Sequence, residues 1–211
     1  MPARAGPSTV EAMEVTFTKL HGRRYRMTVV RERGPELAPR QGPGYDGRLP
    51  HDAVHLLVEA EAGLRGGAFG RIAAGRSNIF FPADPAQRRR QARKEAKSPP
   101  SAADRADMAR SEQLAGVCQA QWELRSGRRS QLPEWYGLLK PETVPAALLN
   151  RIVGRLDEFA ERWRELPVGG SVTVPWPGLR AGSASRTGGR TGGRTGNRSG
   201  GRARARRRSA L

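Results

Sequence analysis

Hydrophobic and polar residues alternate near the N-terminus and again after residue 170, and such alternation is typical of strands with one buried face. Residues 14–20 and 24–30 both alternate, and they flank a short turn that contains Gly22. Two such runs around a short turn predict a β-hairpin. Residues 171–176 form a third run, whose proline suits the edge of a sheet. A strand there can return to the hairpin and complete a small antiparallel sheet.

Other segments carry apolar residues three or four positions apart, which is the spacing of helices that bury one side. The first segment follows Pro50 and covers residues 51–62. The second begins at Ser101 and Asp104, which are spaced as a capping box, and ends at Gly127. Both segments predict helices that pack on the sheet.

The clearest helical pattern is the last one, and it stops at Pro167. Thr143 is placed to cap this helix, and Pro145 fits its first turn. Its apolar residues recur at helical spacing: Leu148, Ile152, Leu156, Phe159 and Trp163. The highly charged segment 82–100 predicts either a solvated helix or a flexible linker.

The predicted fold class is therefore α+β, with a small antiparallel sheet packed by three or four helices. The sheet combines the N-terminal hairpin with the C-terminal strand. We expect a disordered N-terminal extension over residues 1–12, a single α+β domain over 13–178, and a disordered Arg/Gly-rich tail over 179–211. Translation from Met1 and translation from Met13 both fit this division.

Residues 63–75 contain five glycines and predict a tight turn followed by a short helix. Gly66, Gly67 and Gly70 do not form a dinucleotide fingerprint, because a helix rather than a strand precedes them. Close packing of the backbone is the favoured explanation for these glycines. The functional alternative is a phosphate held by the turn before the short helix.

The C-terminal tail is a polycation. The whole chain has 38 Lys and Arg against 20 Asp and Glu, and nine of the arginines follow Ala181 with no acid among them. Glycine recurs between these arginines, and each glycine costs a helix about 1 kcal/mol relative to alanine, so we expect no ordered structure. The nine arginines are Arg186, Arg190, Arg194, Arg198, Arg202, Arg204, Arg206, Arg207 and Arg208.

Guanidinium groups bind phosphate, so the tail predicts non-specific binding of nucleic acid or another polyanion. The tail has no aromatic residue on which bases can stack. Engagement of roughly six phosphates lowers affinity about a thousandfold between 50 and 200 mM salt. The alternative is a low-complexity extension without a role in the cell.

Two of the three histidines, His51 and His55, stand four residues apart on the first predicted helix, so they share one face. Two imidazoles in this arrangement can bind one zinc ion. The run His-Asp-Ala-Val-His is similar to the His-Glu-x-x-His helix of zinc proteases, with Asp52 in place of the general-base glutamate. In the alternative interpretation, His55 is a hydrogen-bonded core residue and Asp52 complements the helix dipole. Catalytic use without metal is a third option.

A zinc site needs a further ligand. Glu59 lies roughly 12 Å along the helix from His51, too far to join both histidines on one ion. The candidates elsewhere in the chain are His21, Asp46 and Glu142. Only their position in the fold can rank them.

The single cysteine, Cys118, excludes an internal disulfide and a cysteine-rich metal site, and its apolar neighbours predict a buried side chain. The N-terminal residues lack the apolar run of a secretory signal, and no apolar stretch is long enough to span a membrane. We therefore expect a cytoplasmic protein.

Three hypotheses of function follow. The leading one is a non-enzymatic binding or accessory protein without a cofactor, tethered to nucleic acid by its tail. The second is a small metal-dependent hydrolase that uses zinc on the His51 and His55 helix. The third is a purely structural interaction protein, which predicts neither bound metal nor salt-sensitive binding once the tail is removed. The type of nucleic acid, the substrate and the oligomeric state stay open.

Overall fold

The computed structural model describes residues 13–42, 48–76 and 79–176. This part of the chain folds into four strands, five α-helices and three short 3₁₀ helices. In chain order the elements are β1 (Met13–Lys19), η1 (His21–Arg23), β2 (Tyr25–Arg31), β3 (Arg40–Gln41), α1 (His51–Ala62), α2 (Ala68–Ala73), α3 (Pro85–Ala96), α4 (Ala102–Arg125), η2 (Glu134–Leu139), η3 (Pro141–Thr143), α5 (Ala146–Glu165) and β4 (Ser171–Trp176).

The strands form one antiparallel sheet in the order β3-β2-β1-β4, so β1 is central and the last strand pairs with the first. Val15 faces Val29 on one side and Val174 on the other. The apolar face of the hairpin is buried, and Val15 and Phe17 are completely inaccessible. The predicted α+β fold, the hairpin and the return of the C-terminal strand are all confirmed. Pro175 lies on the edge strand β4, a position in which a sheet tolerates a residue without an N–H.

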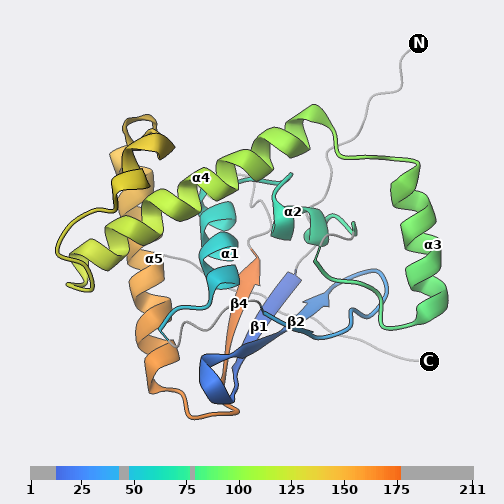
Figure 1. Cartoon of the computed structure of the whole chain (residues 1–211). Coiled ribbons are helices and arrows are strands. Elements are labelled where there is room, and N and C mark those ends of the chain that lie inside the picture. The colour runs from blue at the N-terminus through green and yellow to red at the C-terminus, as the bar shows by residue number, and fades with distance from the viewer. Residues whose placement is uncertain (1–12, 43–47, 77–78, 177–211) are drawn as a thin grey trace, which may run out of the picture. The chain divides into compact units, whose positions relative to one another are not determined.

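Helix α1 lies between the sheet and α4, with α5 beside it (Figure 1). This sandwiched position explains why α1 is apolar on more than one side: Leu56, Leu57 and Val58 are all buried. On its sheet side, Asp52 accepts a hydrogen bond of 2.5 Å from the Tyr25 hydroxyl of β2. Gly42 supplies the room for that ring, since a Cβ there would lie 2.0 Å from a carbon of Tyr25.

Helix α5 covers the sheet with the apolar face that its sequence predicts. The Phe159 ring meets Phe17 edge-on at 5.5 Å between centroids, and both rings are buried. Lys19 donates from Nζ to the carbonyls of Trp163 and Leu166 at 3.0 and 2.9 Å. A cation at these terminal carbonyls stabilises the helix end and ties β1 to α5.

The structure differs from the prediction at the start of α5 and in strand β3. Thr143 belongs to η3 and does not cap α5; Pro145 takes that position, and Pro50 does the same at α1. Strand β3 was missed, because two residues are too few to show alternation. The capping box of Ser101 and Asp104 is present as predicted.

The charged segment after Pro82 is a helix rather than a linker. Within α3, no side chain is buried, so the solvated-helix interpretation is confirmed for residues 85–96. Asp84 caps the helix by accepting from the backbone N–H of Ala86. Residues 1–12 and the tail lie outside the described residues, and the expected domain boundaries stay a prediction.

Candidate functional site

The nine tail arginines that carry the predicted polyanion site lie outside the described residues, and so does Asp46. At least two places among the described residues gather polar or charged side chains. One is a buried polar network between α1, α2 and α4. The other is a cleft beside α3.

The two histidines of α1 share one face, as their spacing predicts. Their ring centroids are 4.7 Å apart. They differ in environment, because His51 is exposed and His55 is 8% exposed. The His55 Nδ1 lies 3.1 Å from the Ser111 hydroxyl of α4, which in turn donates to Glu59 Oε1 at 3.0 Å.

This chain of hydrogen bonds favours one tautomer of neutral His55. A serine hydroxyl has one proton, and here that proton points to Glu59. When Glu59 is ionised, Nδ1 of His55 is therefore the donor to Ser111, and the neutral ring carries its proton on Nδ1. Burial lowers the pKa of His55, partly opposed by the carboxylate of Glu112, whose Oε2 lies 3.8 Å from Nε2. His55 is thus a hydrogen-bonded, largely buried residue, which is the alternative that the sequence left open.

Glu59 is the centre of the network and is completely inaccessible. Its two carboxylate oxygens accept from the backbone N–H groups of Ala68, Phe69 and Gly70 at 2.8, 2.8 and 3.2 Å. Together with Ser111, these donors fill four acceptor positions. Glu59 therefore caps the N-terminus of α2 from a different helix. Burial raises its pKa to about 7, although the hydrogen bonds from Ser111 and the three N–H groups act in the opposite direction.

The glycines before and within α2 make room for this carboxylate and for close packing. A Cβ on Gly67 would lie 2.3 Å from Cδ of Glu59, and one on Gly66 would lie 2.5 Å from Cα of Asp104. The favoured prediction of close packing is therefore confirmed. The phosphate alternative is wrong, because the Glu59 carboxylate already occupies the N–H groups of the first turn.

The zinc-hydrolase hypothesis finds no complete ligand set. Within residues 13–42, 48–76 and 79–176, no group of three or more His, Cys, Asp or Glu side chains is arranged to hold a metal ion. His21 lies in η1 and Glu142 in η3. Asp52, which stands where zinc proteases have their general-base glutamate, accepts a hydrogen bond from the Tyr25 hydroxyl. Cys118 is buried as predicted, and burial raises the pKa of its thiol to about 12.

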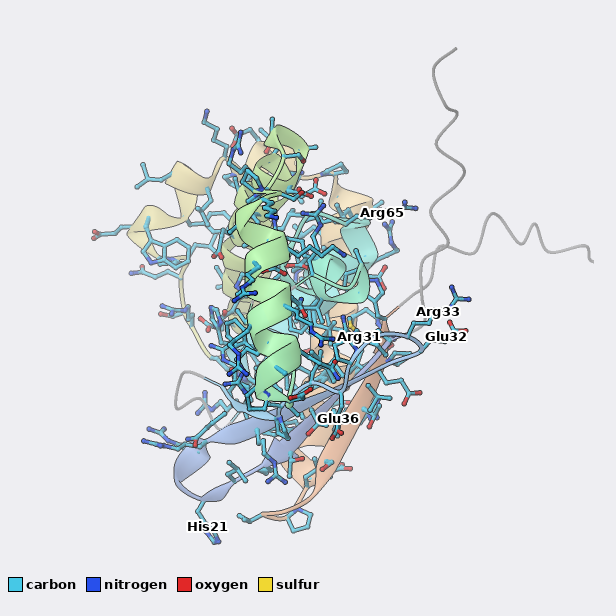
Figure 2. All side chains as sticks on the ribbon, turned by 90° about the vertical axis from the view of Figure 1, so that its right-hand side faces the viewer. His21, Arg31, Glu32, Arg33, Glu36 and Arg65 are labelled. Carbon is cyan, nitrogen blue, oxygen red and sulfur yellow. The ribbon has the colours of Figure 1, made fainter. Side chains whose placement is uncertain are left out.

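The second site, here called the α3 cleft, has a volume of about 620 Å³. It lies where α3 faces the end of β2 and the end of α2. Its charged lining residues are Arg31, Arg33, Arg76, Arg90, Lys94 and Glu95. Figure 2 looks at α3 from outside and shows Arg31 beside this helix, at the end of β2. The charges of α3 are visible in the sequence, but the cleft is not, because Arg31 and Arg76 come from other segments.

Comparison with protein-family models, with curated proteins and with solved structures finds no match. Among the helices of the described residues, none is both long and apolar enough to cross a membrane.

Proposed function

We propose that this protein is a non-enzymatic binding or accessory protein that attaches non-specifically to nucleic acid. In this proposal the Arg/Gly tail supplies most of the attachment, and the cationic helix α3 supplies a structured contact. The observation that carries the proposal is the charge of α3. Residues 85–96 contain five Arg or Lys and one Glu, and none of these side chains is buried.

Helix α3 contributes no buried side chain to the core, so apolar packing does not explain its sequence. Its cations also stand close together: Arg89 precedes Arg93 by four residues, and Arg90 precedes Lys94 by four. Like charges at this spacing each cost a helix about 0.2–0.5 kcal/mol. A bound polyanion removes that repulsion, which makes phosphate binding more favourable than at a mixed-charge helix.

The expected binding is independent of base sequence. Neither α3 nor the tail contains an aromatic residue on which a base can stack. Contacts from arginine and lysine to phosphates carry no sequence information. A cytoplasmic location and a protein partner belong to the same proposal as expectations from the sequence.

The test is fluorescence anisotropy with short labelled RNA, single-stranded DNA and duplex DNA between 50 and 200 mM salt, the range in which phosphate contacts are lost steeply. Four proteins are compared: the full chain, a chain ending at Gly178, the Arg89→Ala/Arg93→Ala variant and the Arg162→Ala/Arg164→Ala variant. The last pair removes the same charge from exposed positions of α5 and is the matched control.

We expect the truncation to weaken binding most, and the α3 variant to lower the slope of log affinity against log salt by about 1–2. The α5 control should change the slope less. Equal affinity of the truncated and full chains would remove the tail from the proposal. Absence of salt-dependent binding by the full chain would overturn the proposed function.

A further inference from the structure

The α3 cleft combines concave shape with an excess of positive charge. Its volume of about 620 Å³ lies within the range of small-molecule sites. Among the described residues that line it, five are Arg or Lys and one is Glu. The cations come from three segments of the chain and converge on one hollow. On an ordinary exposed helix, like charges point apart into solvent.

Arg31 is held in place in this cleft. Its guanidinium donates from Nη1 to the Ile72 carbonyl at 3.2 Å and from Nη2 to the Pro35 carbonyl at 3.0 Å. Gly34 and Gly75 flank the group; a Cβ on Gly34 would lie 3.0 Å from Nη2. A guanidinium fixed by backbone carbonyls loses little entropy when it meets an anion.

Helix α3 forms the opposite wall of the cleft, and a hydrogen bond links it to the end of α2. Gln91 of α3 donates to the Gly75 carbonyl at 3.4 Å and to Glu95 Oε1 at 3.2 Å. Arg76, just after α2, donates to the Ser98 carbonyl at 3.4 Å. The bonds to Gly75 and Ser98 connect α3 and the segment after it to the end of α2.

The lining also limits the kind of ligand. None of the described residues around the cleft is aromatic, which leaves no platform for a base or a sugar ring. The excess of four positive charges exceeds what one orthophosphate neutralises. A chain of phosphates brings three or more negative charges into a compact volume, and its oxygens accept from several guanidinium groups at once.

We propose that the α3 cleft binds the phosphate chain of a compact polyphosphate, with three or more phosphates. A nucleoside triphosphate and linear inorganic polyphosphate share this chemistry. Arg90 and Lys94 contact the chain from α3, and Arg31 and Arg76 contact it from the other wall. The cleft shares α3 with the proposed nucleic-acid surface but uses the helix face opposite to Arg89 and Arg93, which do not line it.

The test is nuclear magnetic resonance of the ¹⁵N-labelled full chain titrated with inorganic tripolyphosphate at one fixed salt concentration. The backbone amides of Gly34, Gly75 and Ser98 report on the cleft, and amides of α5 serve as the reference. The tail is the same in every protein compared, so its own binding cancels. We expect saturable shifts at the three cleft amides and much weaker shifts with orthophosphate.

Paired variants place the binding on one face of α3. Arg90→Ala/Lys94→Ala should weaken tripolyphosphate binding at the cleft amides about tenfold, the effect of about 0.7 kcal/mol for each of two exposed ionic contacts. Arg89→Ala/Arg93→Ala removes the same charge from the outer face and should change it less than threefold. Arg90→Lys/Lys94→Arg keeps both charges and should retain binding, which separates loss of charge from disturbance of the fold.

The two sources of the ligand are compared in the same titration. Adenosine triphosphate that binds like tripolyphosphate supports recognition of the phosphate chain alone, and tighter binding of the nucleotide supports a contribution from the nucleoside. The inference is overturned if orthophosphate binds as tightly as tripolyphosphate, or if both alanine pairs weaken binding equally. Nucleic-acid binding that persists in that case leaves the proposed function intact, so the two failures are distinguishable.

Discussion

Glu59 of α1 accepts a hydrogen bond of 2.8 Å from the backbone N–H of Phe69, in the first turn of α2. A carboxylate on one helix thus replaces the side-chain cap that α2 lacks, since its own N-cap residue is Gly67. The negative charge also lies at the positive end of the helix dipole. The position of α2, and with it the end of α2 that lines the α3 cleft, depends on this contact.

We predict that Glu59→Ala destabilises the protein by about 3–5 kcal/mol, because it leaves three backbone N–H groups and Ser111 without their acceptor in a buried place. Urea unfolding followed by circular dichroism measures the change. Glu61→Ala is the control: Glu61 pairs with the partly exposed side chains of Arg151 and Arg155, and its loss should cost about 1 kcal/mol or less. Similar losses for both variants would contradict the role given to Glu59.

The pKa of Glu59 predicts a pH dependence of stability with a definite sign. Burial raises this pKa from 4.5 to about 7, so between these pH values the folded chain binds more protons than the unfolded chain. The contribution of Glu59 to stability is full below pH 4.5, falls as the pH rises to about 7, and is then constant. Glu59→Gln does not titrate. The stability of the natural chain relative to this variant should therefore fall across that range; a flat difference would show an unshifted pKa.

The contribution of His55 to stability depends on pH in the opposite direction, because burial lowers the pKa of His55 below the ordinary value of 6.5. Its contribution is present above pH 6.5 and is lost as the pH falls through the lowered pKa. The comparison with Glu59→Gln separates the two residues, since both proteins in that comparison contain His55.

The hydrogen-bond chain from His55 through Ser111 to Glu59 predicts the tautomer of the neutral histidine. The proton should lie on Nδ1, because the Ser111 hydroxyl already donates to Glu59. Long-range ¹H–¹⁵N correlation spectra at a pH above 7 distinguish the two ring nitrogens. Ser111→Ala should abolish the preference for this tautomer. A proton on Nε2 in the natural chain would reverse the direction of the whole network.

The sheet and the helices were predictable because their signals are local. Val15 and Phe17 alternate with polar residues, and Leu156, Phe159 and Trp163 recur at helical spacing, so the buried face can be identified within each segment. The capping box of Ser101 and Asp104 is likewise complete within four residues. Strand β3 carries no such local signal, since its two residues pair with β2 but are too few to form a pattern.

The site residues were less predictable because their partners are distant in sequence. Glu59 sits among apolar residues of α1, which is a signal of a buried acid, but Ser111 comes 52 residues later. From the sequence, Glu59 was weighed only as a metal ligand of the histidine pair. The residues of the α3 cleft are also distant in sequence, since Arg31 and Lys94 line the same cleft only after folding. Spacing placed His51 and His55 on one face but left open which interpretation of the pair was correct.

Substitution by alanine should change the stability of the protein in opposite directions at Gly67 and at Gly154. A Cβ on Gly67 would lie 2.3 Å from Cδ of Glu59, and that carboxylate cannot move without losing its four donors. We expect Gly67→Ala to destabilise the protein by about 2–3 kcal/mol.

Gly154, inside α5, has nothing within 4 Å of the position of a Cβ. Gly154→Ala should therefore stabilise the protein by about 0.5–1 kcal/mol, because alanine is the better helix former. Thermal and urea unfolding of both variants measure these changes. Tolerance of alanine at Gly67 would mean that α2 can shift away from Glu59, which contradicts the fixed position of α2 that the α3 cleft requires.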